Sequence, residues 1–364
     1  MLQQAHYTYD PAGRLASITT DGFPAISYLY DGAGRVVQKL YGGDTPANAS
    51  VVASISYDDR SRLARIEFSG KDLNSPLLLT YEWDAASHLT RRSWNGGKQR
   101  YEYDAGGQLL KVIDDTGGRT LEAYRYDLAG NMLEKSIDGQ RTAMTYNAAN
   151  QLVKAIHLPE DADTEGKSPE ELEKMGREVL TYSYDKAGRM LGAGGQPTST
   201  YGWLDKVTEI TQPDGSKTIL SYWPDGQLAS RKSAGSGLGS GSASSIQQVS
   251  YHPEKSAGES FLWDGLALLK RNNTVYVIEP HPSGGVPVAS HPVGRPDRIT
   301  WHLNDLLGTT LATVEGGNVR LAHLTAFGQP LKLGADTPTT PSQPAARAQP
   351  TLPSPQQVQK TTIK

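Results

Sequence analysis

The sequence of 364 residues contains no cysteine. Disulfide bonds, a thiol nucleophile and thiolate metal sites are therefore excluded. No apolar run approaches the roughly 18 residues that a membrane helix needs, and residues 1–6 lack the basic and apolar regions of a signal peptide. The net charge of −3 is too small to attract nucleic acid or an anionic membrane. We therefore expect neither a membrane span nor a nucleic-acid partner, and the cellular location stays open.

Large apolar side chains are also scarce. Hydrophobic residues make up 37% of the chain and only 4 residues are Phe, whereas Gly (38) and Tyr (18) are abundant. This mixture favours a β-protein that is rich in turns and carries tyrosines on its sheet.

A short phrase recurs along the chain: an aromatic, any residue, a second aromatic, an acid, two further residues, Gly, a polar residue and an aliphatic. Its clearest copy is Tyr7-Thr8-Tyr9-Asp10-Pro11-Ala12-Gly13-Arg14-Leu15. Close copies occupy residues 28–36, 124–132 and 182–190. Internal repeats with a period of this order indicate a repetitive architecture.

Each part of the phrase has a physical meaning. Alternating aromatics suit a strand, because residues two apart share one face. An Asp bonds the backbone two residues further on, and Gly adopts the positive φ of a tight turn. A second turn follows some residues later, for example at Asp21-Gly22 and Asn95-Gly96. The phrase therefore predicts β-hairpins that pair edge to edge, since an isolated hairpin is barely stable.

The second aromatic of each copy, here called the anchor, precedes the acid. Some copies differ from the clearest one: Ser61 and Ser87 stand in the place of Gly, and Asn147 and Asn150 replace both Asp and Gly. Asn tolerates the left-handed conformation better than most residues, so the turn is preserved. The sequence predicts the anchors Tyr9, Tyr30, Tyr57, Trp83, Tyr103, Tyr126, Tyr146, Tyr184, Trp203 and Trp223.

A longer gap holds an insertion at about residues 157–177. Ser168, Pro169 and Glu171 form the start of a capped helix that runs to about Arg177. The segment 161–166 imitates the first half of a calcium loop, but Leu172 stands where the twelfth-position Glu belongs. An acidic turn that leads into the helix is the preferred interpretation.

Composition divides the chain into four parts. Residues 1–232 form the repeat array with its helical insertion, and residues 233–246 are a Gly/Ser-rich linker. Residues 247–333 return to a β-type pattern, and residues 334–364 are a Pro-rich tail for which disorder is expected.

The repeated phrase over residues 7–230 resembles the YD repeat of RHS proteins, of toxin-complex components and of the teneurin shell. The segment from Trp301 to Gly328 is similar to the RHS-associated core that ends such arrays. The resemblance implies an all-β fold, in which antiparallel YD-repeat hairpins form a curved or spiralling partial shell with one short helical insertion. It also implies a bacterial, secreted or cell-surface setting, and it identifies the chain as an orphan or truncated array.

In its toxin members, the family implies a self-cleavage step that depends on an Asp-Pro-x-Gly motif after the core. Here Asp336 is followed by Thr337 and Pro338, and the aspartate that precedes Phe-Gly is replaced at Thr325 or Ala326. We therefore expect no protease, and the absence of catalytic, cofactor-binding and metal-binding residues.

The commonest catalytic motifs are missing, including G-x-S-x-G, H-E-x-x-H and G-x-G-x-x-G. His302 and Asp305 lie close together in the core-like segment, where a structural role is preferred to catalysis. The repeat aspartates are interpreted as turn formers. Tyrosines on a sheet face can also stack on sugars, so a carbohydrate-binding surface module remains the alternative.

The preferred hypothesis is a non-enzymatic scaffold that encapsulates or presents a toxin or another polypeptide. About eleven hairpins, or some 22 strands, would leave free sheet edges, and such edges pair with other chains. The partners expected are therefore a polypeptide cargo or another shell segment, with carbohydrate as the partner under the alternative hypothesis.

The free sheet edges lead to a first prediction. The isolated protein should associate as its concentration rises over a roughly hundredfold range, because unpaired strand edges recruit further strands. Light scattering measures the mean mass at each concentration. A constant monomer mass across the whole range would contradict the prediction.

Overall fold

The computed structural model describes residues 4–234, 258–281, 284–322 and 324–329. Within them, 27 strands form one sheet, accompanied by the short helix α1 (Pro169–Met175) and the 3₁₀ turn η1 (Trp203–Asp205). Every strand pair whose register is resolved is antiparallel and joins strands that follow each other in sequence, such as β5 and β6. The expected all-β fold of antiparallel hairpins is confirmed.

The chain divides into two compact units. Unit 1 comprises Met1–Arg125, Ser136–Asp138 and Thr274–Lys364, and unit 2 comprises Tyr126–Lys135 and Gly139–Asn273. The strands of unit 1 are β1 (Ala5–Tyr9), β2 (Leu15–Thr20), β3 (Phe23–Tyr30), β4 (Val36–Tyr41), β5 (Val51–Tyr57), β6 (Leu63–Ser69), β7 (Leu77–Trp83), β8 (Leu89–Trp94), β9 (Gly97–Tyr103), β10 (Leu109–Asp114), β11 (Thr120–Tyr126), β23 (Thr274–Glu279), β24 (Val286–Pro292), β25 (Thr300–Asn304), β26 (Thr310–Glu315) and β27 (Asn318–Leu321).

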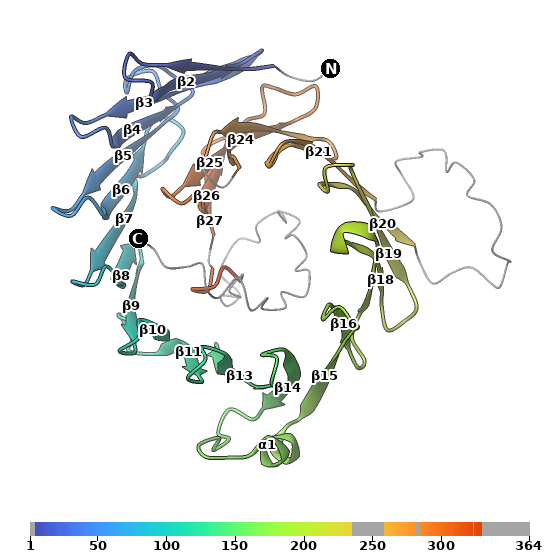
Figure 1. Cartoon of the computed structure of the whole chain (residues 1–364). Helices are drawn as coiled ribbons and strands as arrows, with labels where there is room; N and C mark the ends of the chain where they lie inside the picture. Colours follow the sequence, from blue (N-terminus) through green and yellow to red (C-terminus); the bar gives the residue numbers. More distant parts are fainter. Residues whose placement is uncertain (1–3, 235–257, 282–283, 323, 330–364) are drawn as a thin grey trace, which may run out of the picture. The chain divides into compact units, whose positions relative to one another are not determined.

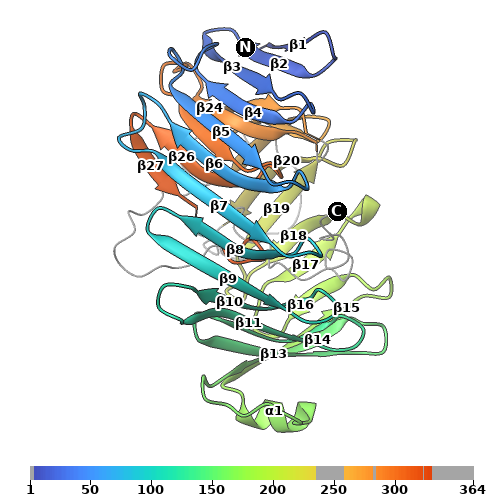
Figure 2. The ribbon, with the colours of Figure 1, turned by 90° about the vertical axis from the view of Figure 1, so that its left-hand side faces the viewer.

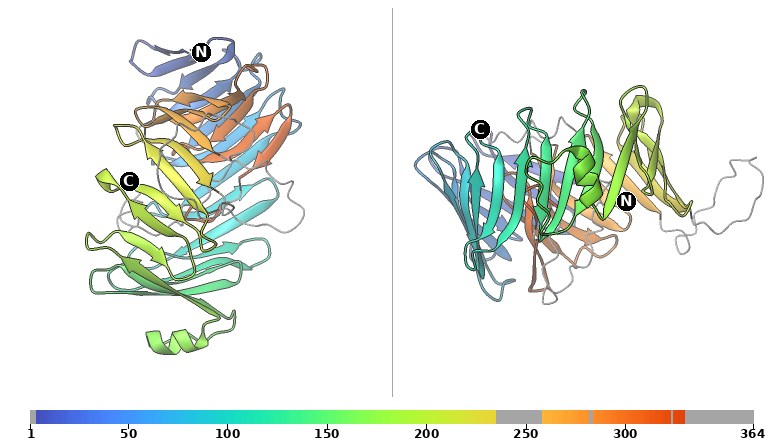
Figure 3. Two further views of the ribbon diagram at one scale, coloured as in Figure 1. Left: turned by 90° about the vertical axis from the view of Figure 1, so that its right-hand side faces the viewer. Right: turned by 90° about the horizontal axis from the view of Figure 1, so that it is seen from below.

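Unit 2 holds the remaining strands, and the ends of β11 and β12 fall at the boundary. In Figure 3 the strands from β12 to β20 are coloured green to yellow and α1 is the green helix, which packs against β14. The strands of unit 2 are β12 (Met132–Ile137), β13 (Gln140–Tyr146), β14 (Leu152–Leu158), β15 (Glu178–Tyr184), β16 (Met190–Ala193), β17 (Thr198–Tyr201), β18 (Val207–Thr211), β19 (Lys217–Tyr222), β20 (Leu228–Ala234), β21 (Glu259–Asp264) and β22 (Ala267–Arg271).

The largest apolar core lies in unit 1, between two layers of strands. One layer is β2 to β7 and the other is β23 to β26, which lies against it in Figure 1 and Figure 2. Trp301 is 2% exposed, and its ring meets Phe23 and Tyr41 edge to face at 5.5 and 5.8 Å between centroids. Burying aromatic rings in this way contributes strongly to stability. The layering follows because the hairpins expose one apolar face that must be covered.

A buried ion pair joins the same two layers. Lys39 on β4 is 8% exposed and pairs with Glu279 at the end of β23. The Lys39 ammonium also lies 5.5 Å and 5.2 Å from the ring centroids of Tyr28 and Tyr41. Since removal of one partner would strand a buried charge, this pair favours one arrangement of the layers over others.

The insertion has the predicted helix. The Ser168 hydroxyl accepts a hydrogen bond from the Glu171 N–H, and the Glu171 carboxylate accepts one from the Ser168 N–H, which is the capping box. Leu172 packs with Ala143, Ile156 and Leu158 in a small core of unit 2. The helix ends at Met175, two residues before the predicted end.

The count of about 22 strands was too low, since 27 are present in the described residues. Short strands in the segment 259–321 account for much of the difference, because the phrase is degenerate there. The predicted linker lies almost wholly outside the described residues and the predicted tail entirely so. The domain boundaries stay predictions.

Candidate functional site

The repeat turn is built on its aspartate. Asp10 Oδ1 accepts hydrogen bonds from the N–H groups of Ala12 and Arg14, each at 2.9 Å, and Asp10 Oδ2 accepts one from Arg14 Nε at 2.7 Å. Gly13 has φ +75°, which a residue with a Cβ adopts only with strain. The same pattern recurs at Asp31 and Asp185, so the interpretation of the aspartates as turn formers is confirmed.

Most anchors lie at a β-bulge. Tyr30 pairs with Val36, whereas Leu29 pairs with Gln38, so the strand β4 carries one extra residue. A bulge disrupts the ladder of backbone hydrogen bonds locally and increases the twist. The irregularity recurs at the same place in successive hairpins, for example between Ser56 and Tyr57.

In nine hairpins the polar atom of the anchor reaches back to the preceding hairpin. The Tyr57 hydroxyl donates to the carbonyl of Val36 at 2.9 Å, and Val36 is the residue paired with the anchor before it. This bond, which we call the junction bond, supplies a donor beside the bulge. Junction bonds are Tyr30 to Leu15, Tyr57 to Val36, Trp83 to Leu63, Tyr103 to Leu89, Tyr146 to Met132, Tyr184 to Leu152, Tyr201 to Met190, Tyr222 to Val207 and Trp263 to Leu228.

In four turns an arginine, namely Arg14, Arg35, Arg62 or Arg189, covers the anchor of the next hairpin. Arg14 lies over Tyr30 with its Cζ 4.4 Å from the ring centroid, and Arg35 lies over Tyr57 at 4.6 Å. Such cation–π contacts contribute about 0.5–1 kcal/mol at partly exposed sites. The same arginine is also paired with the aspartate of its own turn. Each such arginine therefore connects its turn to the next hairpin.

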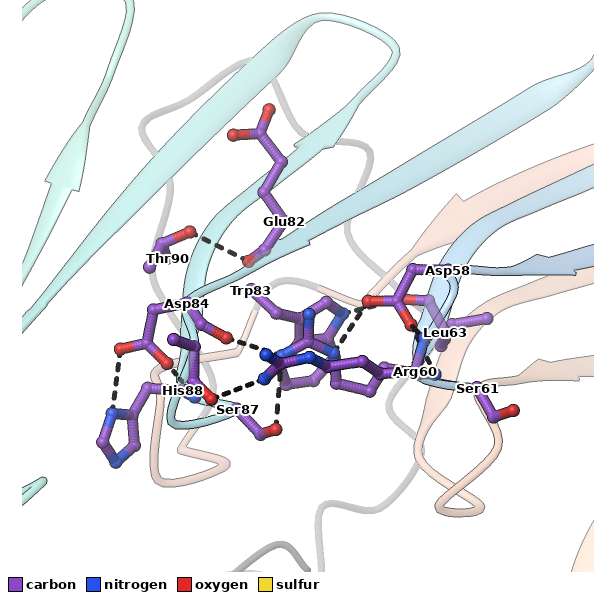
Figure 4. A network of polar contacts seen from close by, with 12 residues as sticks. Asp58, Arg60, Ser61, Leu63, Glu82, Trp83, Asp84, Ser87, His88 and Thr90 are labelled. Carbon is purple, nitrogen blue, oxygen red and sulfur yellow. Dashed lines mark hydrogen bonds and ion pairs between the residues drawn. The ribbon is translucent and has the colours of Figure 1, made fainter.

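Figure 4 shows one such junction in unit 1. The Trp83 indole donates to the Leu63 carbonyl at 2.8 Å, and Arg62 donates from one nitrogen to the Asp84 carbonyl at 2.6 Å. Arg60 in the same turn donates to the Ala85 carbonyl at 2.7 Å. Two neighbouring turns are thereby tied together through backbone acceptors.

The diverged copies keep the geometry with other residues. Ser61, Ser87 and Asn150 adopt positive φ in the place of Gly, at 61°, 70° and 55°. His88 replaces Arg: it bonds Asp84 through Nδ1 at 3.0 Å and stacks on Tyr103 at 4.9 Å between centroids. The diverged copies thus keep the same contacts although their residues differ.

Two predicted anchors were wrong. Tyr201 and Tyr222 make the junction bonds, while Trp203 is 67% exposed in η1 and Trp223 is 44% exposed. The error arose because both tryptophans stand two residues before an acid, Asp205 and Asp225, whereas an anchor directly precedes its acid. A usable signal was the Tyr that stands six residues before the aliphatics Val207 and Leu228.

The core-like segment contains two more turns of the same design. Asp305 Oδ1 accepts from the N–H groups of Leu307 and Thr309 at 2.9 and 2.8 Å. Thr325 takes the aspartate's place in the next turn, where its Oγ1 accepts from the Gln329 N–H at 2.9 Å. Thr325 is therefore the residue that stands in place of the aspartate expected before Phe327-Gly328.

The electrostatics of the turns favour ionised acceptors. Hydrogen bonding from the Arg14 side chain lowers the pKa of Asp10, and that from the Arg189 backbone N–H lowers the pKa of Asp185. A carboxylate held in this state accepts hydrogen bonds and is a poor general acid. Within the described residues no group of three His, Asp or Glu side chains could hold a metal ion, and this includes the acidic segment 161–166.

His302 is buried in unit 1 on β25, and its Nε2 lies 2.9 Å from Ser290 Oγ on β24. Burial lowers the pKa of His302 from its ordinary 6.5 to about 4. Both side chains are about 5% exposed. A serine–histidine pair that substrate cannot reach is a core hydrogen bond, which agrees with the preferred structural role.

The chain is similar to known proteins in part of its sequence and in its fold. The teneurin YD-shell family model matches residues 48–166. The fold is similar to that of a crystallised TcdB2-TccC3-TEV chain, with a TM-score of 0.55, 13% identity, and coverage of 90% of this chain and 18% of that chain. It is also similar to the Photorhabdus luminescens Tc holotoxin pore with the TccC3-D651A mutation, with a TM-score of 0.53, 14% identity, and coverage of 90% and 17%.

At this identity the likeness concerns the fold, and the chain spans less than a fifth of the length of these two structures. No curated protein matches the sequence. No helix among the described residues has the length and apolarity to cross a membrane.

The aspartate turn, the bulge and the junction bond define a YD-repeat β-sheet protein. The match to the teneurin YD-shell model over residues 48–166 and the likeness of the fold to the two Tc toxin structures agree with the resemblance of the repeated phrase to the YD repeat.

The junction bond generates a prediction with a matched control. Tyr57→Phe removes the hydroxyl that donates to Val36 and should lower the free energy of unfolding by about 1 kcal/mol. Tyr9→Phe should change it by less than about 0.3 kcal/mol, because Tyr9 is 59% exposed and makes no junction bond in the described residues. Urea denaturation measures both. Equal effects would contradict the role of the bond.

His302 generates a prediction on pH. In the folded state its pKa is about 4, so the unfolded chain binds the proton more readily between pH 6.5 and 4. The free energy of unfolding should therefore fall by up to about 3 kcal/mol as the pH drops through that window. His302→Gln should remove this part of the pH dependence, and the control His6→Gln, at an exposed position, should not. Denaturation curves at stepped pH measure the difference.

Proposed function

We propose that this chain is a non-enzymatic β-sheet scaffold that encloses or presents a polypeptide. The observation that carries the proposal is that the distinctive residues of the repeat are used within the sheet. Aspartates are bound to their own turns, anchors to the preceding hairpin and arginines to the following one. Because these residues are engaged in contacts within the sheet, they stabilise the sheet and leave few side chains available for catalysis.

The absence of catalysis rests on the same bonds. Asp10 and Asp185 accept hydrogen bonds that lower their pKa, and the buried Ser290 and His302 face each other away from solvent. A general acid needs a pKa near the working pH and access to substrate. None of these described residues combines a pKa near the working pH with access to substrate.

The carbohydrate alternative has less support. The anchor hydroxyls that would bind a sugar donate to backbone carbonyls, and several anchor rings are covered by arginine. Stacking on a sugar needs an open ring face. We therefore favour the scaffold over a glycan-binding module.

The partner that we propose is a polypeptide, either a cargo or another shell segment. In the described residues the resolved pairing of β1 is with β2, which follows it, and no strand precedes β1 among them. Its anchor Tyr9 is exposed and carries a hydroxyl that, elsewhere in the chain, donates to a preceding hairpin. A strand from another segment would satisfy both features.

The proposal is tested with a fused passenger polypeptide that contains one protease site. Fused after Lys364, the passenger should be cleaved about tenfold more slowly than the same passenger fused before Met1, because an enclosed chain is reached only when the sheet opens. The two fusions have the same composition, and the cleavage rate is followed on gels. Equal rates at the two ends would contradict enclosure.

A further inference from the structure

A buried carboxylate in unit 1 binds the backbone of a distant turn. Glu122 on β11 is 1% exposed, and its Oε1 and Oε2 lie 3.1 and 3.0 Å from the N–H of Ala326. The two residues are 204 positions apart in the sequence. A hydrogen bond to a carboxylate is roughly twice as strong as one between neutral groups.

The surroundings of Glu122 complete a site for this turn. The Tyr124 hydroxyl donates to Glu122 Oε2, and the Tyr124 ring meets Phe327 edge to face at 5.0 Å. Residues 325–329 have the repeat-turn geometry, since Thr325 N–H donates to the Gln329 carbonyl at 2.7 Å and Gly328 N–H to the Thr325 carbonyl at 3.0 Å. The turn is therefore ordered in itself and fastened at two adjacent points.

In the other repeat turns the contacts to neighbours come from an arginine or its replacement. Here the neighbouring sheet supplies an acid, and the turn supplies a backbone donor. We propose that Glu122 is a latch which fastens the turn 325–329 to β11 and so holds the end of the core-like segment against the sheet.

The proposal deepens the proposed function, because a passenger that follows the core would start from this turn. The fastening itself is local and can be measured without any passenger. The passenger can lose its protection while the latch stays intact, and the latch can be lost while the passenger stays protected. The two experiments distinguish these outcomes.

The charge of Glu122 faces several groups. Burial raises the pKa of Glu122, while the Tyr124 hydroxyl, the Ala326 N–H and the charge of Arg92 on β8 oppose the rise. Tyr101 on β9 is also close enough to interact with Glu122 electrostatically. Glu122→Gln keeps a carbonyl oxygen that can accept from the Ala326 N–H and an amide that can donate to the Tyr124 hydroxyl, so it is expected to keep the latch.

One variant removes only the donor. The first repeat turn carries Pro11 directly after Asp10, the place that Ala326 takes after Thr325. Ala326→Pro is therefore compatible with the turn and deletes the N–H that Glu122 accepts. The matched control is Ala105→Pro, at the same place in the turn that follows Asp104.

Hydrogen exchange followed by mass spectrometry measures the latch. The amides of residues 324–329 should exchange about tenfold faster in Ala326→Pro and in Glu122→Ala than in the wild type. Glu122→Gln and Ala105→Pro should stay within about twofold of the wild type at these amides. Trypsin cleavage after Arg320 on β27 should accelerate in the same two variants.

Wild-type exchange in Ala326→Pro would overturn the latch. So would equal acceleration in the peptides of β5 and β6, because that result indicates general loosening of unit 1. Should Glu122→Ala fail to fold, the comparison of Ala326→Pro with Ala105→Pro decides alone.

Discussion

A hydroxyl or indole N–H on one hairpin, donated to a carbonyl on the hairpin before it, is the interaction on which the rest of the sheet depends. It occurs beside a bulge, where the backbone ladder is interrupted and an extra donor has most effect. The aspartate turn places the arginine over the ring that donates. Turn, bulge and junction are thus one device, and each hairpin positions the next.

Much of this could be predicted from the sequence. Alternating Tyr28 and Tyr30 correctly indicated one buried face, since both join the core while Leu29 is 42% exposed. The capped helix after Ser168 was also predictable, because the capping box is a local interaction. Interactions of this kind form between residues that are close in sequence, so they do not depend on contacts that the fold makes between distant segments.

The rest depended on contacts between distant residues. Nothing near Lys39 in the sequence announces Glu279, and nothing near Glu122 announces Ala326. Trp203 was mistaken for an anchor because the letters around it fit, whereas the bond to Met190 comes from Tyr201. The repeated phrase supplies the side chains that can donate, and the register of the two strands determines which of them makes the junction bond.

The acceptor of the junction bond belongs to the main chain, so the preceding hairpin need not carry any particular side chain to receive it. Leu, Val and Met all occupy that position in this protein. Gene duplication or deletion of a whole hairpin would therefore leave a compatible neighbour on either side without compensating substitutions. A wall built on main-chain acceptors can change its length in evolution one hairpin at a time.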